Sequence, residues 1–371
     1  MTVSTFLDLA LIALITVTFW SAPALARPTL PFGVRVPGRR AAEPAIVRAR
    51  HRYTRGVALL GALTYAVVGA VSLGFGRELP PALVLPILAA CCCGLGYQAH
   101  RAVAAAKRDG DWYAGTRQAV ATDTSLRTDP VRPQWILLAP AVALLVLTAG
   151  IGVWRYGALP PTLPTPNDLV VDAGRRGTTT FAAAFATVIA QLVLVLLIGL
   201  LAVALPRARP ELDAARPAGS AAQYRAYLGG VLRLLFVSAC GVTASLLVIS
   251  LQVWEILPAT VAVTVVGYLP LAAATVAWAV FAVRAGDAGH RLPAGETDDE
   301  SPRVQRDDDR HWYAAGMIYL NRRDPAVLVH RRAGAVWTLN LGHPVSWAVL
   351  AAIALVAALA GFGVIELPTR G

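Results

Sequence analysis

The chain has 371 residues, of which 56% are hydrophobic and only 15% are charged. Soluble domains carry about 25% charged residues, so the composition excludes an ordinary soluble protein and favours a chain embedded in lipid. The formal charge is +11, and the basic residues lie in the segments between apolar runs. This distribution is typical of a protein oriented in a membrane. We therefore expect no nucleic-acid partner, since such a partner would favour a basic stripe on one folded face.

Eight apolar runs are long enough to cross a hydrocarbon core of about 30 Å as helices. Backbone groups in lipid must be hydrogen-bonded within their own segment, which favours helices, and the alternating segments of a β-barrel are not seen. The predicted fold is therefore all-α, a polytopic membrane protein with about eight transmembrane helices at residues 5–26, 57–76, 81–99, 134–153, 179–205, 232–253, 259–283 and 345–365.

The first run ends at Ala24-Leu25-Ala26, which resembles a signal-peptidase site. However, residues 1–5 carry no basic side chain, whereas eight arginines follow in residues 27–56. This polarity is the reverse of a secretory signal, and it favours an uncleaved anchor that runs from outside to inside.

Basic side chains divide unequally between alternate loops. By loop parity, 28 of the 33 fall on one side, and five fall on the other: Arg77, Arg155, Arg175, Arg176 and Arg370. Because cytoplasmic loops carry the excess of arginine and lysine, we expect a multi-pass cell-membrane protein with both termini extracytoplasmic.

The runs and loops divide the chain into five predicted parts. Residues 1–133 form an N-terminal three-helix region, 134–284 a four-helix region, 285–310 an acidic linker, 311–344 a juxtamembrane motif, and 345–371 the last helix with a short outer tail. Within the linker, residues 286–310 are rich in carboxylates and poor in apolar side chains, so we expect a solvated segment. Its acidic residues are Asp298, Asp299, Glu300, Asp307, Asp308 and Asp309.

Residues 311–344 differ in character from the linker. Two β-prone pieces, 326–330 and 335–341, flank a hairpin-like turn, and residues 321–325 have turn chemistry. Aromatic side chains alternate with arginines here, which suits the headgroup layer and anionic inner-leaflet lipids. We expect a small cytoplasmic hairpin-like element on the membrane; binding of a ligand or of an unidentified protein partner is the alternative.

This motif resembles the domain-of-unknown-function family 5808. The pattern of that family is a tryptophan, a Tyr-Asn-x-x-Asp-Pro turn, and a Val-x-x-Arg-x-Gly-x-x-Trp-Thr-Leu-Asn segment before a closing helix. Arg322 stands where the family usually has proline. The resemblance gives a candidate interaction motif of ten residues: Trp312, Tyr319, Asn321, Asp324, Pro325, Arg332, Gly334, Trp337, Thr338 and Asn340.

The middle of the chain resembles the domain-of-unknown-function family 1648, which occurs in the immunity protein of the Sdp toxin system. The resemblance lies in Leu159-Pro160 and Pro164 of an outer loop, with Pro166 or Asn167 near the place of the usual histidine, and in residues 32–37. It implies a non-enzymatic immunity or envelope signal-relay protein.

Catalytic and cofactor motifs are not seen. All six histidines lie in or beside cytoplasmic loops, the four cysteines lie in apolar runs, and no HExxH, P-loop, GxSxG or GxGxxG element occurs in a suitable context. We expect no enzyme activity, cofactor or metal. The alternative function is a transporter or permease component, suggested by eight helices, a possible repeat of a Leu-Pro two-helix unit and the intramembrane Gln191.

Overall fold

The computed structural model describes residues 3–76, 79–167, 170–294, 301–332, 334 and 336–361. They form two compact units, each assembled from separate stretches of chain. Unit 1 comprises Met1–Asp129, Ala208–Tyr227 and Ala282–Trp347, and unit 2 comprises Pro130–Arg207, Leu228–Phe281 and Ala348–Gly371. The juxtamembrane motif thus belongs to the same unit as the first three helices, although about 200 residues separate them.

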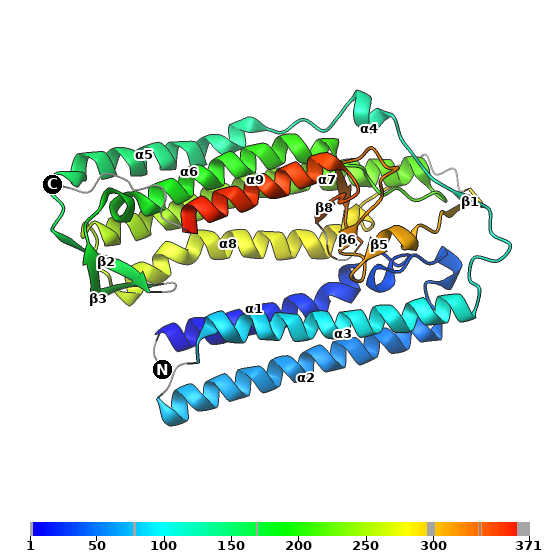
Figure 1. The fold of residues 1–371 in the computed structure, drawn as a ribbon, viewed down its shortest axis with the longest axis horizontal. Coiled ribbons are helices and arrows are strands. Elements are labelled where there is room, and N and C mark those ends of the chain that lie inside the picture. The colour runs from blue at the N-terminus through cyan, green and yellow to red at the C-terminus, as the bar shows by residue number, and fades with distance from the viewer. Residues whose placement is uncertain are drawn as a thin grey trace. The chain divides into compact units, whose positions relative to one another are not determined.

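Three long helices form the frame of unit 1: α1 (Val3–Leu25), α2 (Pro44–Phe75) and α3 (Pro81–Asp109) lie side by side (Figure 1). Their shared core includes Ile12, Val57 and Cys92. At Gly61 of α2 a methyl group would lie 2.2 Å from the Thr16 side chain of α1. A residue without a side chain at this position lets the two helices approach closely.

Helices α2 and α3 extend beyond the apolar runs that predicted them. α2 begins 13 residues earlier than expected, and α3 continues ten residues past its predicted end at 99. The extensions contain Arg48, Arg52 and Lys107, and arginine and lysine favour the helical conformation. Hydropathy finds the part of a helix that fits in lipid, so it cannot detect such polar continuations.

The remaining parts of unit 1 are short. They are the 3-10 turns η1 (Pro31–Gly33), η2 (Gly38–Arg40), η5 (Asp287–Gly289) and η6 (Asp309–His311), the helix α4 (Ser125–Thr128), the start of α7 (Pro217–Val253), and the parallel pair β1 (Gln118–Ala119) and β4 (Val304–Gln305). Residues 301–310 of the predicted linker contact other segments through β4 and the acidic residues that follow it, and each of them is partly or fully exposed. Residues 298–300 lie outside the described ranges.

The juxtamembrane motif folds as two small antiparallel hairpins. β5 (Trp312–Tyr313) pairs with β6 (Ile318–Tyr319), and β7 (Leu328–His330) pairs with β8 (Trp337–Leu339). The second hairpin confirms the predicted one. The first was not predicted, because Ala314, Ala315 and Gly316 form its turn with positive φ, and only the glycine is a residue typical of that conformation.

Unit 2 is a helical bundle with one hairpin. Its elements are η3 (Trp135–Leu138), α5 (Ala139–Tyr156), α6 (Phe181–Ala204), η4 (Leu205–Arg207), the rest of α7, most of α8 (Val261–Ala285), most of α9 (Pro344–Gly361), and β2 (Thr162–Asn167) paired with β3 (Val170–Thr178). The hairpin occupies a segment that we expected to be an outer loop. It is held by Leu159 and Leu163, which pack with Phe185 and Trp254.

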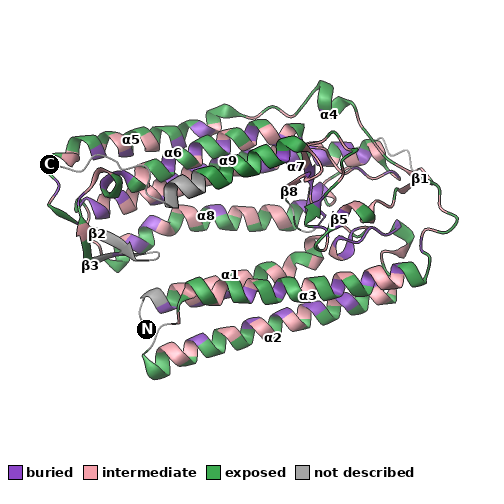
Figure 2. Cartoon of the chain, viewed as in Figure 1, coloured by how far each residue is buried: buried purple, intermediate pink, exposed green. Residues whose placement is uncertain are grey.

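Some polar side chains are buried between the helices, whereas many large apolar side chains are exposed. Within unit 2, Gln191, Thr243 and Ser250 are buried, while Leu196 and Leu200 of α6 are exposed. Much of the helix surface is exposed in Figure 2, and in unit 1 it carries large apolar side chains such as Leu59. Exposed apolar surfaces of this kind are consistent with contact with a lipid bilayer.

Seven helices in the described residues are long and apolar enough to cross a membrane: α1, α2, α3, α5 with η3, α6, α7 and α8. They coincide with the first seven predicted spans. The eighth coincides with α9 (Pro344–Gly361), whose apolar part over Pro344–Leu355 is shorter than the other seven. The predicted residues 362–365 of that span lie outside the described ranges.

Candidate functional site

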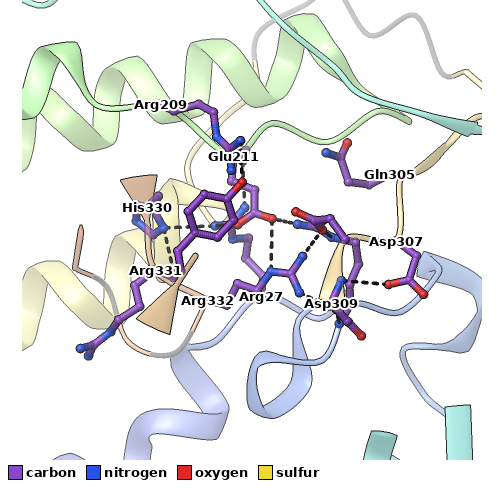
Figure 3. A network of polar contacts seen from close by, with 12 residues as sticks. Arg27, Arg209, Glu211, Gln305, Asp307, Asp309, His330, Arg331 and Arg332 are labelled. Carbon is purple, nitrogen blue, oxygen red and sulfur yellow. Dashed lines mark hydrogen bonds and ion pairs between the residues drawn. The ribbon is translucent and has the colours of Figure 1, made fainter. Parts of the chain in front are cut away.

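Arg332, in the segment between β7 and β8, lies at the centre of a buried charged cluster in unit 1 (Figure 3). Its side chain is 0% exposed, and its guanidinium is paired with both Asp308 and Asp309. Nε lies 3.8 Å from Oε1 of Glu211, and the guanidinium carbon lies 5.0 Å from the ring centroid of Trp312. This arginine does not face lipid, because its whole side chain is enclosed by carboxylates and an aromatic ring.

The loop after α1 and the end of α3 supply two further cations. Arg35 binds Glu211, donates from Nε to Asp308 Oδ1 at 3.1 Å, and donates from its backbone N–H to Asp309. Lys107 Nζ lies 2.7 Å from Asp307 and 2.6 Å from Asp309. Asp307, Asp308 and Asp309 are therefore bound by two segments, the loop after α1 and the end of α3, that lie about 200 or more residues away in sequence.

A second part of the cluster is centred on Arg27, directly after α1. Its Nε donates to Asp287 Oδ2 at 3.1 Å, Nη1 donates to the carbonyl oxygen of Glu211 at 2.8 Å, and Nη2 lies 3.3 Å from Nδ1 of His330. Asp287 lies two residues after the end of α8, and His330 ends β7. Arg27 thus links the end of α1, the end of α8 and the second hairpin.

Charge in the cluster is nearly balanced. The cations are Arg27, Arg35, Lys107 and Arg332, and the carboxylates are Glu211, Asp287, Asp307, Asp308 and Asp309. Burying an ion costs several kcal/mol unless it is paired and hydrogen-bonded, so each member depends on the others.

Burial and ion pairing shift the pKa values in this cluster. Burial alone would raise the pKa of Asp308 and Asp309, but Arg332 and the neighbouring cations outweigh it and hold both pKa values below the usual range. Burial, together with the nearby charge of Arg332, lowers the pKa of Arg35 to about 10. These three groups stay charged near neutral pH.

Asn340 organises the juxtamembrane motif itself. Its Nδ2 donates to the carbonyl oxygens of Asn321, Asp324 and Ala326 at 3.0–3.1 Å, and its Oδ1 accepts from the N–H groups of Asn321 and Gly342 at 3.0 Å. The side chain is fully buried. One amide therefore fixes the 321–326 turn against the chain that enters α9.

The predicted turn at residues 321–325 is confirmed. Asn321 Oδ1 accepts from the N–H of Arg323 at 3.0 Å, which is an Asx turn. Asp324 accepts from the hydroxyl of Tyr319 at 2.9 Å and is paired with Arg209. Arg209 also joins the edge of the second hairpin, because its N–H donates to the Leu328 carbonyl oxygen at 2.9 Å.

Aromatic residues complete the site. Trp312 and Tyr319 lie with ring centroids 4.7 Å apart, and Trp337 Nε1 donates to the hydroxyl of Tyr224 at 3.2 Å. His330 lies among Tyr224, Tyr227 and Trp337.

The structure brings most of the predicted residues together, namely Trp312, Tyr319, Asn321, Asp324, Arg332, Trp337 and Asn340. Gly334 has a φ of +81° between the strands of the second hairpin, Thr338 pairs with Val329 in that hairpin, and Pro325 is exposed. Sequence reasoning missed the cluster members in other segments, above all Arg35, Glu211 and Asp287. One signal of the cluster was available in the sequence: Lys107, which pairs with Asp307 and Asp309, is the only lysine of the chain.

The fold and site define a multi-pass helical membrane protein. In it a small hairpin module, residues 311–344 with the two hairpins β5–β6 and β7–β8, is joined to the helix ends through buried ion pairs. A family model described as a family of unknown function (DUF5808) matches residues 322–347, which include Asp324, Arg332, Trp337 and Asn340. No curated protein and no solved structure matches the chain.

Proposed function

We propose that the chain is a non-enzymatic membrane protein of the immunity or envelope signal-relay type, with its hairpin module on the cytoplasmic side. One observation supports this most: the charged cluster joins the module to residues next to the ends of α1, α3 and α8 and to the segment before α7. A change in the position of any of these helix ends alters an ion pair of the cluster that holds Arg332 of the module, and such a linkage is a physical requirement for a relay.

The placement of the module follows from the distribution of arginine. The segments that meet in the cluster come from the loops that carry 28 of the 33 basic residues, and such loops are cytoplasmic in membrane proteins of known orientation. We propose that the protein lies in the plasma membrane with both termini outside. The resemblance of residues 156–167 and 32–37 to family 1648 favours the immunity type.

Two experiments test this proposal. Reporter fusions at residues 40, 120, 215 and 300 should give a cytoplasmic signal, and a fusion at 168 should give an external one. An external signal at 300 would overturn the proposed placement. Cells that lack the gene should change in sensitivity to an antimicrobial peptide or to envelope stress, and unchanged sensitivity across a broad panel would contradict the relay role.

A point variant sharpens the second experiment. Complementation with the wild-type gene should restore the original sensitivity, whereas Arg332→Met should not, because the cluster loses its central cation. Arg303→Gln is the control, since Arg303 is an exposed arginine outside the charged cluster and should complement fully.

The transporter alternative relied on Gln191. This side chain is buried, and its Nε2 donates to the carbonyl oxygen of Thr243 in α7 at 3.1 Å. Such bonds commonly join membrane helices and contribute about 0.6–1.7 kcal/mol. Gln191→Leu should therefore lower thermal stability slightly and leave the cellular phenotype intact. Solute uptake into liposomes that is lost in this variant would favour the transporter instead.

A further inference from the structure

The arginines of the hairpin module fall into two environments. Arg332 is buried and paired, and Arg209, from outside the module, pairs with Asp324. Arg322 and Arg323 are instead exposed, and neither forms an ion pair with a residue in the described part of the chain. They are adjacent cations held in an ordered turn, because Asn321 fixes that turn by accepting from the N–H of Arg323.

This exposed pair lies beside the start of α9. A methyl group at Gly342 would lie 2.4 Å from the Asn321 carbonyl carbon and 2.6 Å from the Arg322 nitrogen, so the two backbones are in contact. The N–H of Leu341 also donates to the carbonyl oxygen of Tyr319 at 2.9 Å. α9 begins at Pro344, two residues after Gly342.

Apolar side chains are exposed at the same place. Trp347, in the first turn of α9, is 58% exposed, and its Nε1 donates to the carbonyl oxygen of Leu341 at 2.9 Å. Ile318 and Leu320, which adjoin the turn, are each 40% exposed. Tryptophan is enriched at the border between lipid and water, where its ring lies at the level of the headgroups.

We propose that Arg322 and Arg323, with Leu320 and Trp347, form a binding surface for the phosphate headgroup of an anionic phospholipid. The two guanidinium groups supply the charge complement of the phosphate. The exposed tryptophan and leucine suit the acyl boundary, which a soluble anion does not offer. This surface rests on the proposed membrane-facing position of the module, but it does not depend on the relay role.

The test is a lipid titration of the purified full-length protein in neutral detergent, followed by native mass spectrometry. Phosphatidylglycerol should bind more tightly than phosphatidylcholine, and the preference should fall at high salt. The double variant R322Q/R323Q should weaken phosphatidylglycerol binding about thirtyfold, from about 1 kcal/mol per arginine near a charged surface. The control R303Q/R306Q removes two other exposed arginines and should leave binding unchanged.

Three results would overturn the proposal: equal binding of the two lipids by the wild type, unchanged binding by R322Q/R323Q, or an equal loss in the control. Displacement of phosphatidylglycerol by an equimolar amount of inorganic phosphate would also contradict it, because the site would then bind a soluble anion. Lipid occupancy is measured on purified protein, so failure here is distinct from failure of the relay role, which is measured as cellular sensitivity.

Discussion

Oδ1 of Asp287 faces Nε2 of His330 at 3.6 Å, and neither atom has a hydrogen-bond partner among the described residues. Both side chains are buried, at 5% and 0% exposure. On the other side of the imidazole, Nδ1 lies 3.3 Å from Arg27 Nη2 and 3.1 Å from the carbonyl oxygen of Arg331. Burial lowers the pKa of His330 to about 4, and Arg27 opposes the attraction of Asp287.

This histidine should make stability depend on pH. The pKa is about 6.5 in the unfolded chain and about 4 in the folded protein. The contribution of the neutral histidine to the free energy of unfolding is therefore fully present above about pH 6.5. It decreases as the pH falls toward 4, by up to about 3 kcal/mol. Thermal unfolding in detergent between pH 7 and 4 would measure the decrease.

The variant His330→Gln should flatten this dependence. It should not abolish it, because burial also lowers the pKa values of His290 and His311. His51→Gln, at an exposed position outside the cluster, is the control and should retain the full dependence. An unaltered pH profile in His330→Gln would contradict the assignment.

Arg332→Met should be among the most destabilising single substitutions in unit 1. It leaves Asp308 and Asp309 without their central cation, and breaking a buried pair in this way costs about 3–5 kcal/mol. Arg323→Met, at an exposed position, should change stability by less than about 0.5 kcal/mol. A double variant with Asp308→Asn should lose less than the sum of the two single losses, which a double-mutant cycle would measure.

Asn340→Ala should loosen the module around the 321–326 turn. It removes the only side chain described that contacts the carbonyl oxygens of Asn321, Asp324 and Ala326 together. Buried polar groups left without partners cost about 1–3 kcal/mol each, so we expect a loss of at least 2 kcal/mol. Hydrogen exchange over residues 318–326 should accelerate, whereas Thr338→Ala, in the neighbouring strand, should leave it slow.

Gly33→Ala should separate the loop after α1 from the first hairpin. Gly33 has a φ of +77°, and a methyl group there would lie 2.2 Å from the carbonyl oxygen of Ala315. Both the backbone strain and the clash oppose this substitution, and the neighbouring atom is backbone that cannot rotate away. Increased protease cleavage within residues 311–320 would report the separation. Gly38→Ala meets no atom within 4 Å and is the matched control.

The sequence was sufficient for the features that depend on local pattern. Run length predicted the seven long helices, and turn chemistry at Asn321 predicted the turn beside the second hairpin. Both signals lie within about 20 consecutive residues, so no knowledge of distant contacts is needed.

The charged cluster could not be predicted in this way. Asp308 and Asp309 lie in a segment whose composition predicts a solvated linker, and Arg35 lies in an ordinary basic loop. Their order comes from mutual pairing across more than 270 residues. Composition measures how much apolar surface a segment can bury, and it contains no information on which distant charge neutralises which.

The partners of Arg332 have a consequence for the boundaries of the matched family. The match covers residues 322–347, yet Asp308, Asp309 and Glu211 all lie outside it. A fragment cut at these boundaries would lack the three carboxylates. The guanidinium of Arg332, which is buried and paired in the intact chain, would then be exposed without an ionic partner. Residues 322–347 are therefore not a self-sufficient unit. To graft them onto another protein, the segments that carry Glu211, Asp308 and Asp309 would have to be grafted as well.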